Sequence, residues 1–224
     1  MAQITSGIRA VLSSPAVYDR FQWLMGGRVG RTDFAQHMVR AVAGMRLLDI
    51  GCGTGELLDY LPPGVHYHGW DISEAYVAAA RARFGAKGTL TCGLVTEADI
   101  AAESPYDVVI ASGVLHHLDD REVRALARLA QFAVRGGGRF VSIDPVFANG
   151  QHPLARFLIA RDRGQHVRAP QQYLDLVKPA FSTASGIVRH RRWVPYTHWM
   201  MEAVRHADSA TPAAGPQAAD QRKS

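Results

Sequence analysis

The chain has 224 residues, of which 47% are hydrophobic and 20% are charged. That length and balance are typical of one globular domain with a hydrophobic core. No apolar run approaches the length needed to cross a bilayer, so we expect no membrane insertion. The apolar stretch Ala10–Leu12 is too short for the core of a signal peptide. Two cysteines, Cys52 and Cys92, are too few for a disulfide framework or a metal cage, which predicts a cytoplasmic protein without a metal.

The formal net charge is +5 and the isoelectric point is near 9.5. A basic balance permits binding to nucleic acid or to an acidic surface. The Arg and Lys residues are scattered, however, with one local cluster at Arg189–Arg192. We therefore interpret the charge as a solvated basic surface and expect no nucleic-acid partner.

The first 44 residues and the C-terminal segment differ from the rest of the chain. Residues 1–44 predict two helices, one from Pro15 to Gly26-Gly27 and one from near Thr32 to Gly44. Their apolar residues lie at helical spacing, namely Val17, Phe21 and Leu24 in the first and Phe34, Met38 and Val42 in the second. Residues 206–224 contain no large apolar side chain, which predicts a disordered tail.

From Met45 the pattern alternates between apolar strands and helices. Glycine, proline and capping residues such as Ser73 and Asp119 or Asp120 mark the boundaries. Continuous apolar strands that alternate with helices predict a parallel sheet covered on both faces. We expect strands at 45–50, 65–71, 89–92, 106–111, 139–144, 183–188 and 193–201, and helices at 56–61, 73–84, from 119 or 120 to Gly136–Gly138, 153–162 and 170–178.

A glycine loop, Asp49–Gly55, follows the first strand. Glycines at every second position let the backbone turn tightly and approach a ligand without a Cβ in the way. The alternative is a strand-to-helix turn that needs glycine for geometry alone. A dinucleotide loop of the Gly-x-Gly-x-x-Gly type would place its third glycine at position 56, which is Glu56. The carboxylate of Asp49 also disfavours a pyrophosphate and suits a ligand with an ammonium and a sulfonium group.

Asp71 ends the second strand, twenty residues after Gly51. A carboxylate in this place can accept hydrogen bonds from both hydroxyls of a ribose. The alternative is an N-cap or turn aspartate beside Ser73. The spacing alone does not separate one adenosine cofactor from another.

The stretch Leu47–Gly55 matches hydrophobic-hydrophobic-Asp-x-Gly-x-Gly-x-Gly without a gap. It resembles the first motif of class I S-adenosylmethionine (SAM) dependent methyltransferases, and the resemblance extends over roughly Leu47–Phe147. It implies one α/β domain at 45–205, with a Rossmann-like, doubly wound, mostly parallel seven-stranded sheet. Helices would cover both faces of that sheet, and the C-terminal strand would be antiparallel. SAM would be the cofactor and S-adenosylhomocysteine (SAH) the product.

The resemblance also implies which residues bind the cofactor. Asp71 would bind the ribose, Ile72 would flank the adenine, and backbone at Ser112 would line the methionyl part. The family commonly has an Asp after the third strand, where this chain has Leu94, so recognition of the adenine amine is open. The expected cofactor-binding set is Asp49, Gly51, Cys52, Gly53, Gly55, Asp71, Ile72, Ser112, Tyr18 and Arg28.

The stretch Asp107–Leu118 resembles the fourth motif of small-molecule methyltransferases related to the ubiquinone and menaquinone enzymes. It ends in His116 and His117, close to the expected position of the methyl group. Histidine is suited to act as a general base near neutral pH. Either histidine is a catalytic candidate, with a slight preference for His117, and Asp144 at the end of the fifth strand is the next. The alternative is that the Leu-His-His-Leu segment packs without a catalytic role.

Two further groups of polar residues are weaker candidates. The run Arg161–Arg168 falls where this family often forms its acceptor pocket, although surface ion pairing explains Arg161, Asp162 and Arg163 equally well. Tyr18 and Arg28, on the N-terminal helices, are placed to close over SAM, with Arg28 facing the carboxylate. The alternative is that both are ordinary structural residues.

The resulting hypothesis is methyl transfer from SAM to a small-molecule acceptor, with the O, N or C nucleophile unresolved. An NAD-dependent oxidoreductase is the alternative enzyme, disfavoured by Glu56 and by the lack of an evident Tyr-x-x-x-Lys pair. A non-catalytic SAM-binding protein on the same fold is the second alternative. A nucleic-acid methyltransferase, supported only by the basic isoelectric point, is the third. The sequence leaves the oligomeric state open.

Removal of residues 207–224 should leave the melting temperature and SAM affinity unchanged, because this segment has no apolar anchor. Thermal unfolding and calorimetry of the truncated chain check this. A clear drop in melting temperature would mean that the segment docks on the folded body.

Overall fold

The computed structural model describes residues 27–103, 105–161, 164–191 and 196–207. The first predicted helix, including Tyr18, lies outside the described residues, and so do residues 208–224 of the predicted tail. His206, at the start of that tail, hydrogen-bonds Thr183 Oγ1 through Nε2 at 2.9 Å.

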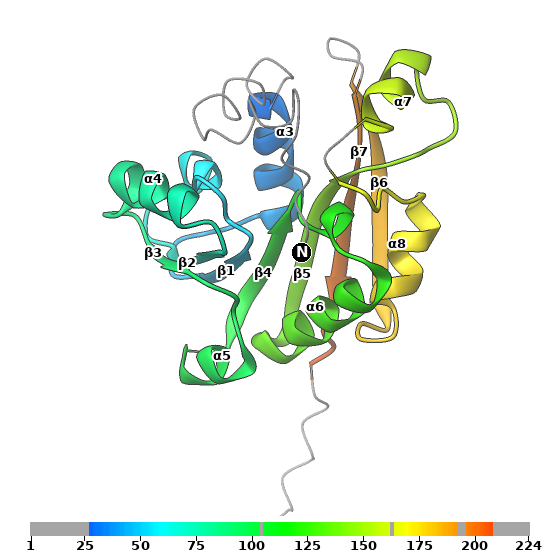
Figure 1. The fold of residues 1–224 in the computed structure, drawn as a ribbon. Helices are drawn as coiled ribbons and strands as arrows, with labels where there is room; N and C mark the ends of the chain where they lie inside the picture. Colours follow the sequence, from blue (N-terminus) through cyan, green and yellow to red (C-terminus); the bar gives the residue numbers. More distant parts are fainter. Residues whose placement is uncertain (1–26, 104, 162–163, 192–195, 208–224) are drawn as a thin grey trace, which may run out of the picture.

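Seven strands form one sheet in the order β3-β2-β1-β4-β5-β7-β6 (Figure 1). The pairs from β3 to β5 are parallel, whereas β7 is antiparallel to both β5 and β6. The predicted fold class is therefore confirmed. The strands are β1 (Arg46–Ile50), β2 (His66–Asp71), β3 (Thr89–Cys92), β4 (Tyr106–Ser112), β5 (Val134–Pro145), β6 (Thr183–Arg191) and β7 (Tyr196–Val204).

Helices cover both faces of the sheet. On one face Phe34 of α3 and Val77 of α4 are buried against side chains of β1 and β4. On the other face Ile100 of α5, Val123 of α6 and Tyr173 of α8 share a second core. The helical elements are α3 (Gly27–Phe34), η1 (Ala35–Val39), η2 (Glu56–Asp59), α4 (Glu74–Phe84), α5 (Glu97–Glu103), η3 (Leu115–His117), α6 (Asp120–Ala133), α7 (Pro153–Ile159) and α8 (Pro170–Val177).

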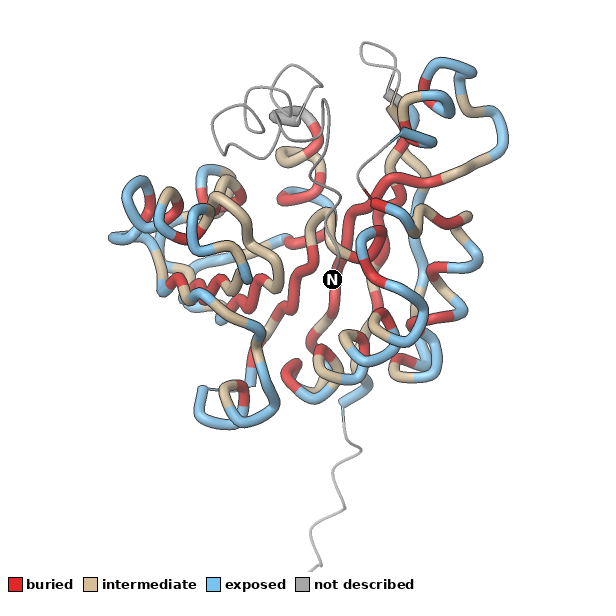
Figure 2. Tube along the Cα trace, in the orientation of Figure 1, coloured by how far each residue is buried: buried red, intermediate tan, exposed pale blue. Residues whose placement is uncertain are grey.

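The central strands are buried on both faces (Figure 2). Leu47 and Leu48 of β1, neighbours that point to opposite faces, are both fully buried. This is why the strands read as continuous apolar runs and not as an alternating pattern. The strand order reverses between β1 and β4, and ligands of open parallel sheets bind at such a switch, beyond the carboxyl ends of the strands.

The second N-terminal helix differs from the prediction at both ends. It begins at Gly27 instead of Thr32, and its last turn, Ala35–Val39, is a π-helix. Arg40 then adopts a left-handed conformation with φ 46°, which ends the helix. Val42 is 57% exposed, so its predicted place on the buried face is wrong, because the helical periodicity stops before it.

Two other boundaries differ. The segment predicted as a helix at 56–61 is a single 3₁₀ turn, Glu56–Asp59. The glycines predicted to separate α6 from the next strand belong to that strand, because Val134 is already extended where α6 ends at Ala133. The N-cap of α6 is Asp119, whose side chain accepts from the Glu122 N–H in a capping box.

The sequence analysis did not predict α5. This helix buries one apolar residue, Ile100, too few for a periodic signal. The start of α5 nevertheless has a local sequence signal, because Thr96 and Asp99 are spaced as in a capping box. The Asp99 N–H donates to Thr96 Oγ1, and the Thr96 N–H donates to Asp99 Oδ2.

Candidate functional site

The three alternate glycines of the loop after β1 all have positive φ, but their surroundings differ. A Cβ on Gly51 would lie 2.5 Å from Val114 Cγ2, and one on Gly55 would lie 3.2 Å from Phe84 Cδ2. A Cβ on Gly53 would meet no atom of the described residues within 4 Å. Gly51 and Gly55 therefore allow close packing, whereas Gly53, with φ 57°, exposes bare backbone to open space.

Asp49 is a buried carboxylate, and one of its two oxygens accepts a hydrogen bond. It ends the apolar part of β1 and is 2% exposed. The Tyr67 hydroxyl donates to Asp49 Oδ2 at 2.7 Å. Asp49 Oδ1 is buried and has no hydrogen-bond partner among the described residues. Burial is the main cause that raises the pKa of Asp49 to about 7. The hydrogen bond from Tyr67 lowers this pKa, and the nearby charge of Asp71 raises it further.

Asp71 ties the loop to the end of β2. Its Oδ2 accepts from the Gly53 N–H at 2.9 Å, and its Oδ1 accepts from the Ser73 N–H at 2.8 Å. The turn-forming role that we weighed as an alternative is therefore present. Each carboxylate oxygen accepts more than one hydrogen bond, so this role leaves capacity for a ligand's hydroxyls.

Apolar side chains flank Asp71 at the same edge of the sheet. Ile72 is 50% exposed and Leu94 is 67% exposed, although both are large and hydrophobic. They follow β2 and β3, which pair in parallel, so both leave the sheet at its carboxyl edge. Exposed apolar residues at a ligand edge suit a flat apolar group such as a purine ring.

Cys52 and Ser112 are partly buried. A Cβ on Gly69 of β2 would lie 2.9 Å from Cys52 Sγ. Burial raises the pKa of the Cys52 thiol above its usual range, so this cysteine is not poised as a nucleophile. Ser112 is the last residue of β4, and its Cα pairs with that of Ile143. Both residues can contribute backbone to the site.

His116 and His117 lie on η3, just past the end of β4, and have different surroundings. His116 is 6% exposed, and its Nδ1 lies 2.9 Å from Oδ1 of the fully buried Asp144. Its backbone N–H also donates to Asp144 Oδ1 at 3.2 Å. His117 is exposed, and its ring lies 4.1 Å from that of His116. The structure thus brings His116 and Asp144 together and leaves His117 on the surface of the described residues.

Residues from the predicted polar run hold this histidine segment. The buried Arg168 guanidinium donates to the carbonyls of Leu115 and Leu118 at 3.0 and 2.8 Å, and to Asp120. A Cβ on Gly164 would lie 2.0 Å from His116 Cδ2, so only glycine fits against the ring. The sequence analysis placed Arg168 in a candidate acceptor pocket. The contacts of the buried Arg168 are with residues about fifty positions earlier in the chain, so no local sequence pattern predicts them.

The N-terminal candidates are not placed in the site by the described residues. Tyr18 lies outside them, and Arg28 lies in α3, where its side chain is not described. Arg31 of the same helix forms an ion pair with Glu56, the residue after the glycine loop. Helix α3 therefore contacts the residue that follows the glycine loop.

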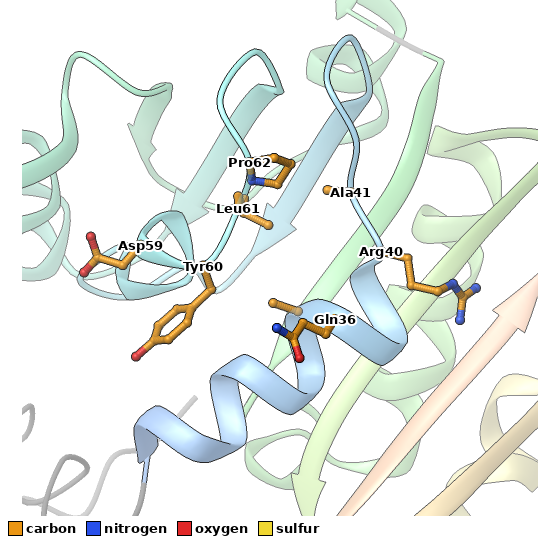
Figure 3. Close-up of a pocket in the computed structure, with 8 residues that line it drawn as sticks. Gln36, Arg40, Ala41, Asp59, Tyr60, Leu61 and Pro62 are labelled. Atoms are coloured by element: carbon orange, nitrogen blue, oxygen red, sulfur yellow. The ribbon is translucent and has the colours of Figure 1, made fainter.

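A pocket of about 430 Å³ lies between η1 and the segment after η2 (Figure 3). In this view Gln36 points toward the Tyr60–Pro62 segment, whereas Arg40 points away, toward the Glu202 carboxylate with which it pairs. None of the predicted cofactor residues lines this pocket. It is separate from the glycine loop and Asp71.

The described residues contain no group of three or more His, Cys, Asp or Glu side chains that could hold a metal ion. No helix among them is long and apolar enough to cross a membrane.

Comparisons with known proteins agree on one family. Residues 48–140 match the model of a methyltransferase domain. The ubiquinone biosynthesis O-methyltransferase of Bordetella parapertussis is 30% identical over 167 residues, which are 70% of this chain and 66% of that protein. The 27-O-demethylrifamycin SV methyltransferase of Amycolatopsis mediterranei is 39% identical over 122 residues, 50% of this chain and 43% of that one. This chain carries a class I SAM-dependent methyltransferase domain.

A solved structure matches the fold of this methyltransferase domain. It is phosphoethanolamine N-methyltransferase 2 of Haemonchus contortus, in complex with phosphomonomethylethanolamine and SAH. The TM-score is 0.67 at 15% identity, over 87% of this chain and 58% of that one. At this identity the likeness shows the fold alone. This chain covers at most 66% of the length of the three proteins.

The residues of the methyltransferase domain fit SAM on three observations. Gly53 leaves open space that a side chain would fill. Asp49 Oδ1 is a buried acceptor without a partner among the described residues, which suits an ammonium group. Asp71, beside the exposed Ile72, suits a ribose next to a purine. The chemistry of these residues therefore fits the ammonium, ribose and adenine groups of SAM.

Asp49→Asn should stabilise the ligand-free methyltransferase domain at pH 8. The pKa of about 7 in the folded state lies above the usual 3.8, so the folded protein binds the extra proton. The wild-type free energy of unfolding therefore falls as pH rises from about 4 to about 7. The neutral amide of Asp49→Asn avoids this loss of stability. We therefore expect its free energy of unfolding at pH 8 to exceed that of the wild type by on the order of 2 kcal/mol.

Chemical denaturation at pH 5 and pH 8 checks this, because the gain should be clearly smaller at pH 5. Asp175→Asn, on the exposed part of α8, is the control and should change little at either pH. A gain of equal size at both pH values would show that the charge of Asp49 is not its cause.

Proposed function

We propose that the protein transfers the methyl group of SAM to a small-molecule acceptor. The observation that carries the proposal is the glycine loop. Among the described residues, Gly53 faces open space, Asp49 Oδ1 has no hydrogen-bond partner, and the Gly53 N–H donates to Asp71. The relatives support it, because their names are those of small-molecule methyltransferases. When bound, SAM supplies an electrophilic methyl group on a sulfonium ion.

Three parts of the chain would bind SAM. Asp49 Oδ1 accepts from the ammonium group, Gly51, Cys52, Gly53 and Gly55 form the backbone cradle, and Asp71 accepts from the ribose hydroxyls. Ile72 flanks the adenine, and backbone at Ser112 borders the methionyl part. Residues 1–44, with Tyr18 and Arg28, are proposed to cover this site. The docking of α3 on Glu56 through Arg31 supports that placement.

His116 is better placed than His117 to act as a base. When Asp144 Oδ1 accepts a hydrogen bond from His116 Nδ1, the imidazole proton lies on Nδ1 and the basic lone pair lies on Nε2. A buried carboxylate also stabilises the imidazolium that forms when Nε2 takes the acceptor's proton. Orientation by Asp144 on one side and Gly164 on the other holds the ring in one position.

The first test is cofactor binding by calorimetry. The wild type should bind SAM and SAH and should not bind NAD. Gly53→Val should abolish binding by filling the open space, whereas Gly44→Val should leave it intact. Gly44 also has positive φ and an open Cβ position, but it lies before β1, at the other edge of the sheet. Asp71→Ala should weaken SAM binding by about 2 kcal/mol, because hydrogen bonds to a charged group are lost.

Binding of NAD without SAM would overturn the proposal. Unchanged affinity in Asp71→Ala would leave Asp71 as a turn residue only. Normal SAM binding by Gly53→Val would mean that this face of the loop does not contact the cofactor.

The second test concerns the base. The protein is incubated with labelled SAM and a metabolite extract, and the labelled product identifies the acceptor. With that acceptor, His116→Gln and Asp144→Asn should each lower kcat by roughly a hundredfold, with SAM affinity nearly unchanged. The ionisation near neutrality that is typical of histidine should disappear from the pH–rate profile of His116→Gln.

His117→Gln is the matched control and should keep most of the activity. Circular dichroism of all three variants excludes unfolding as the cause. A large loss in His117→Gln alone would move the base to the exposed ring. Full activity in all three would mean that positioning and desolvation suffice for the reaction.

A further inference from the structure

Tyr67 is a buried residue on β2 that the family resemblance does not single out, and its hydroxyl reaches the acid of the cofactor loop. Its side chain is 3% exposed, and the hydroxyl donates to Asp49 Oδ2 at 2.7 Å. Burial and the neighbouring carboxylate keep the pKa of Tyr67 far above its usual range, so the hydroxyl remains a donor.

Two glycines make this contact possible. Gly69 lies opposite Asp49 in the parallel register, two residues after Tyr67 and on the same face of β2. A Cβ on Gly69 would lie 2.9 Å from Tyr67 Cε1, and one on Gly88 would lie 2.9 Å from Tyr67 Cδ1. The absence of both side chains leaves the ring a path along the sheet to Asp49.

The hydrogen bond fixes which carboxylate oxygen remains available. Tyr67 occupies Oδ2, whereas Oδ1 is buried without a partner among the described residues. A buried acceptor without a hydrogen bond is costly in the ligand-free protein, and a charged donor would offset that cost.

We propose that Tyr67 is a positioning residue for cofactor binding, because it holds the Asp49 carboxylate with Oδ1 directed to the ammonium group of SAM. The inference rests on the proposed function, since it assumes that SAM binds at the glycine loop. Tyr67 itself does not touch the ligand and acts through Asp49.

The same arrangement makes cofactor affinity depend on pH. Burial raises the pKa of Asp49 to about 7, and an ammonium ligand binds the ionised form better. Affinity therefore rises between about pH 6 and pH 8. The other titratable groups that face Asp49 are Asp71, which raises its pKa, and the Cys52 thiol, which burial keeps protonated. Loss of the Tyr67 hydrogen bond raises the pKa of Asp49 further, so the rise in affinity moves to higher pH.

Calorimetric titration with SAH from pH 5.5 to pH 8 tests the proposal. Tyr67→Phe should weaken binding about tenfold at pH 7 and shift the midpoint of the pH dependence upward. Asp49→Asn should bind weakly at every pH and lose the pH dependence. In the Asp49→Asn background, Tyr67→Phe should have little further effect, because its route to the ligand has been removed.

Two controls separate positioning from a general structural role. 5′-Methylthioadenosine lacks the amino-acid part of SAH, so its affinity should not change in Tyr67→Phe. Tyr106→Phe is the matched variant, because Tyr106 is also a buried tyrosine that donates to a carboxylate, Glu103. It starts β4 at the opposite edge of the sheet and should leave SAH binding unchanged.

The outcomes are distinct. A wild type that binds neither SAH nor 5′-methylthioadenosine overturns the proposed function itself. A wild type that binds SAH, with a Tyr67→Phe variant of the same affinity and midpoint, overturns only the role of Tyr67. Equal losses of SAH and methylthioadenosine affinity in Tyr67→Phe would assign it a structural role instead.

Discussion

The parallel pairing of β1 with β2 on one side and with β4 on the other determines where everything else in the site can lie. Parallel strands end at the same edge of a sheet, and the chain leaves β1 and β4 toward opposite faces. Asp49, Asp71 and the histidine segment after Ser112 are far apart in sequence, yet this register brings them to one edge. The glycine loop crosses that edge between them, held to β2 by the Gly51 and Cys52 N–H groups, which donate to the Trp70 carbonyl.

This edge is built at a cost in stability. Asp49 and Asp144 are both buried, and each has one carboxylate oxygen without a partner among the described residues. A protein selected for stability alone would not keep two such groups. Their retention is consistent with sites whose function needs a poorly solvated charge, since electrostatic interactions are strongest where water is excluded. Burial of Asp49 without a full set of hydrogen bonds is also what raises its pKa.

The sequence predicted the fold and located the glycine loop after β1 because both have local signals. Apolar runs, capping residues and alternate glycines act within a few residues of one another, and six of the seven strands were predicted within three residues at both ends. The seventh, β5, begins five residues before its prediction, because Val134 is extended directly after α6. Helix α5 was not predicted, because its single buried apolar residue, Ile100, gives no helical periodicity in the sequence.

The contacts that organise the site could not be predicted in the same way. Tyr67 of β2 contacts Asp49 of the neighbouring strand β1. His116, just after β4, contacts Asp144 of the neighbouring strand β5, which lies 28 residues later in the chain. Both pairings depend on strand register, which a single sequence does not determine. The sequence also offers no local reason to prefer His117 to His116 as the base. The two adjacent histidines are distinguished by Asp144 of β5, which contacts His116.

Residues 48–140, which match the methyltransferase domain model, contain the glycine loop, Asp71 and the histidine segment. The buried Arg168 lies beyond this region and connects it to the chain that follows β5. Its guanidinium binds the carbonyls on both sides of the histidines, while its own backbone carbonyl accepts from the Phe147 N–H just after β5. A change in the segment from Gly164 to Arg168 therefore reaches His116 directly. Because this segment holds His116 in place, a substitution that reshapes the proposed acceptor pocket there would also move the proposed base.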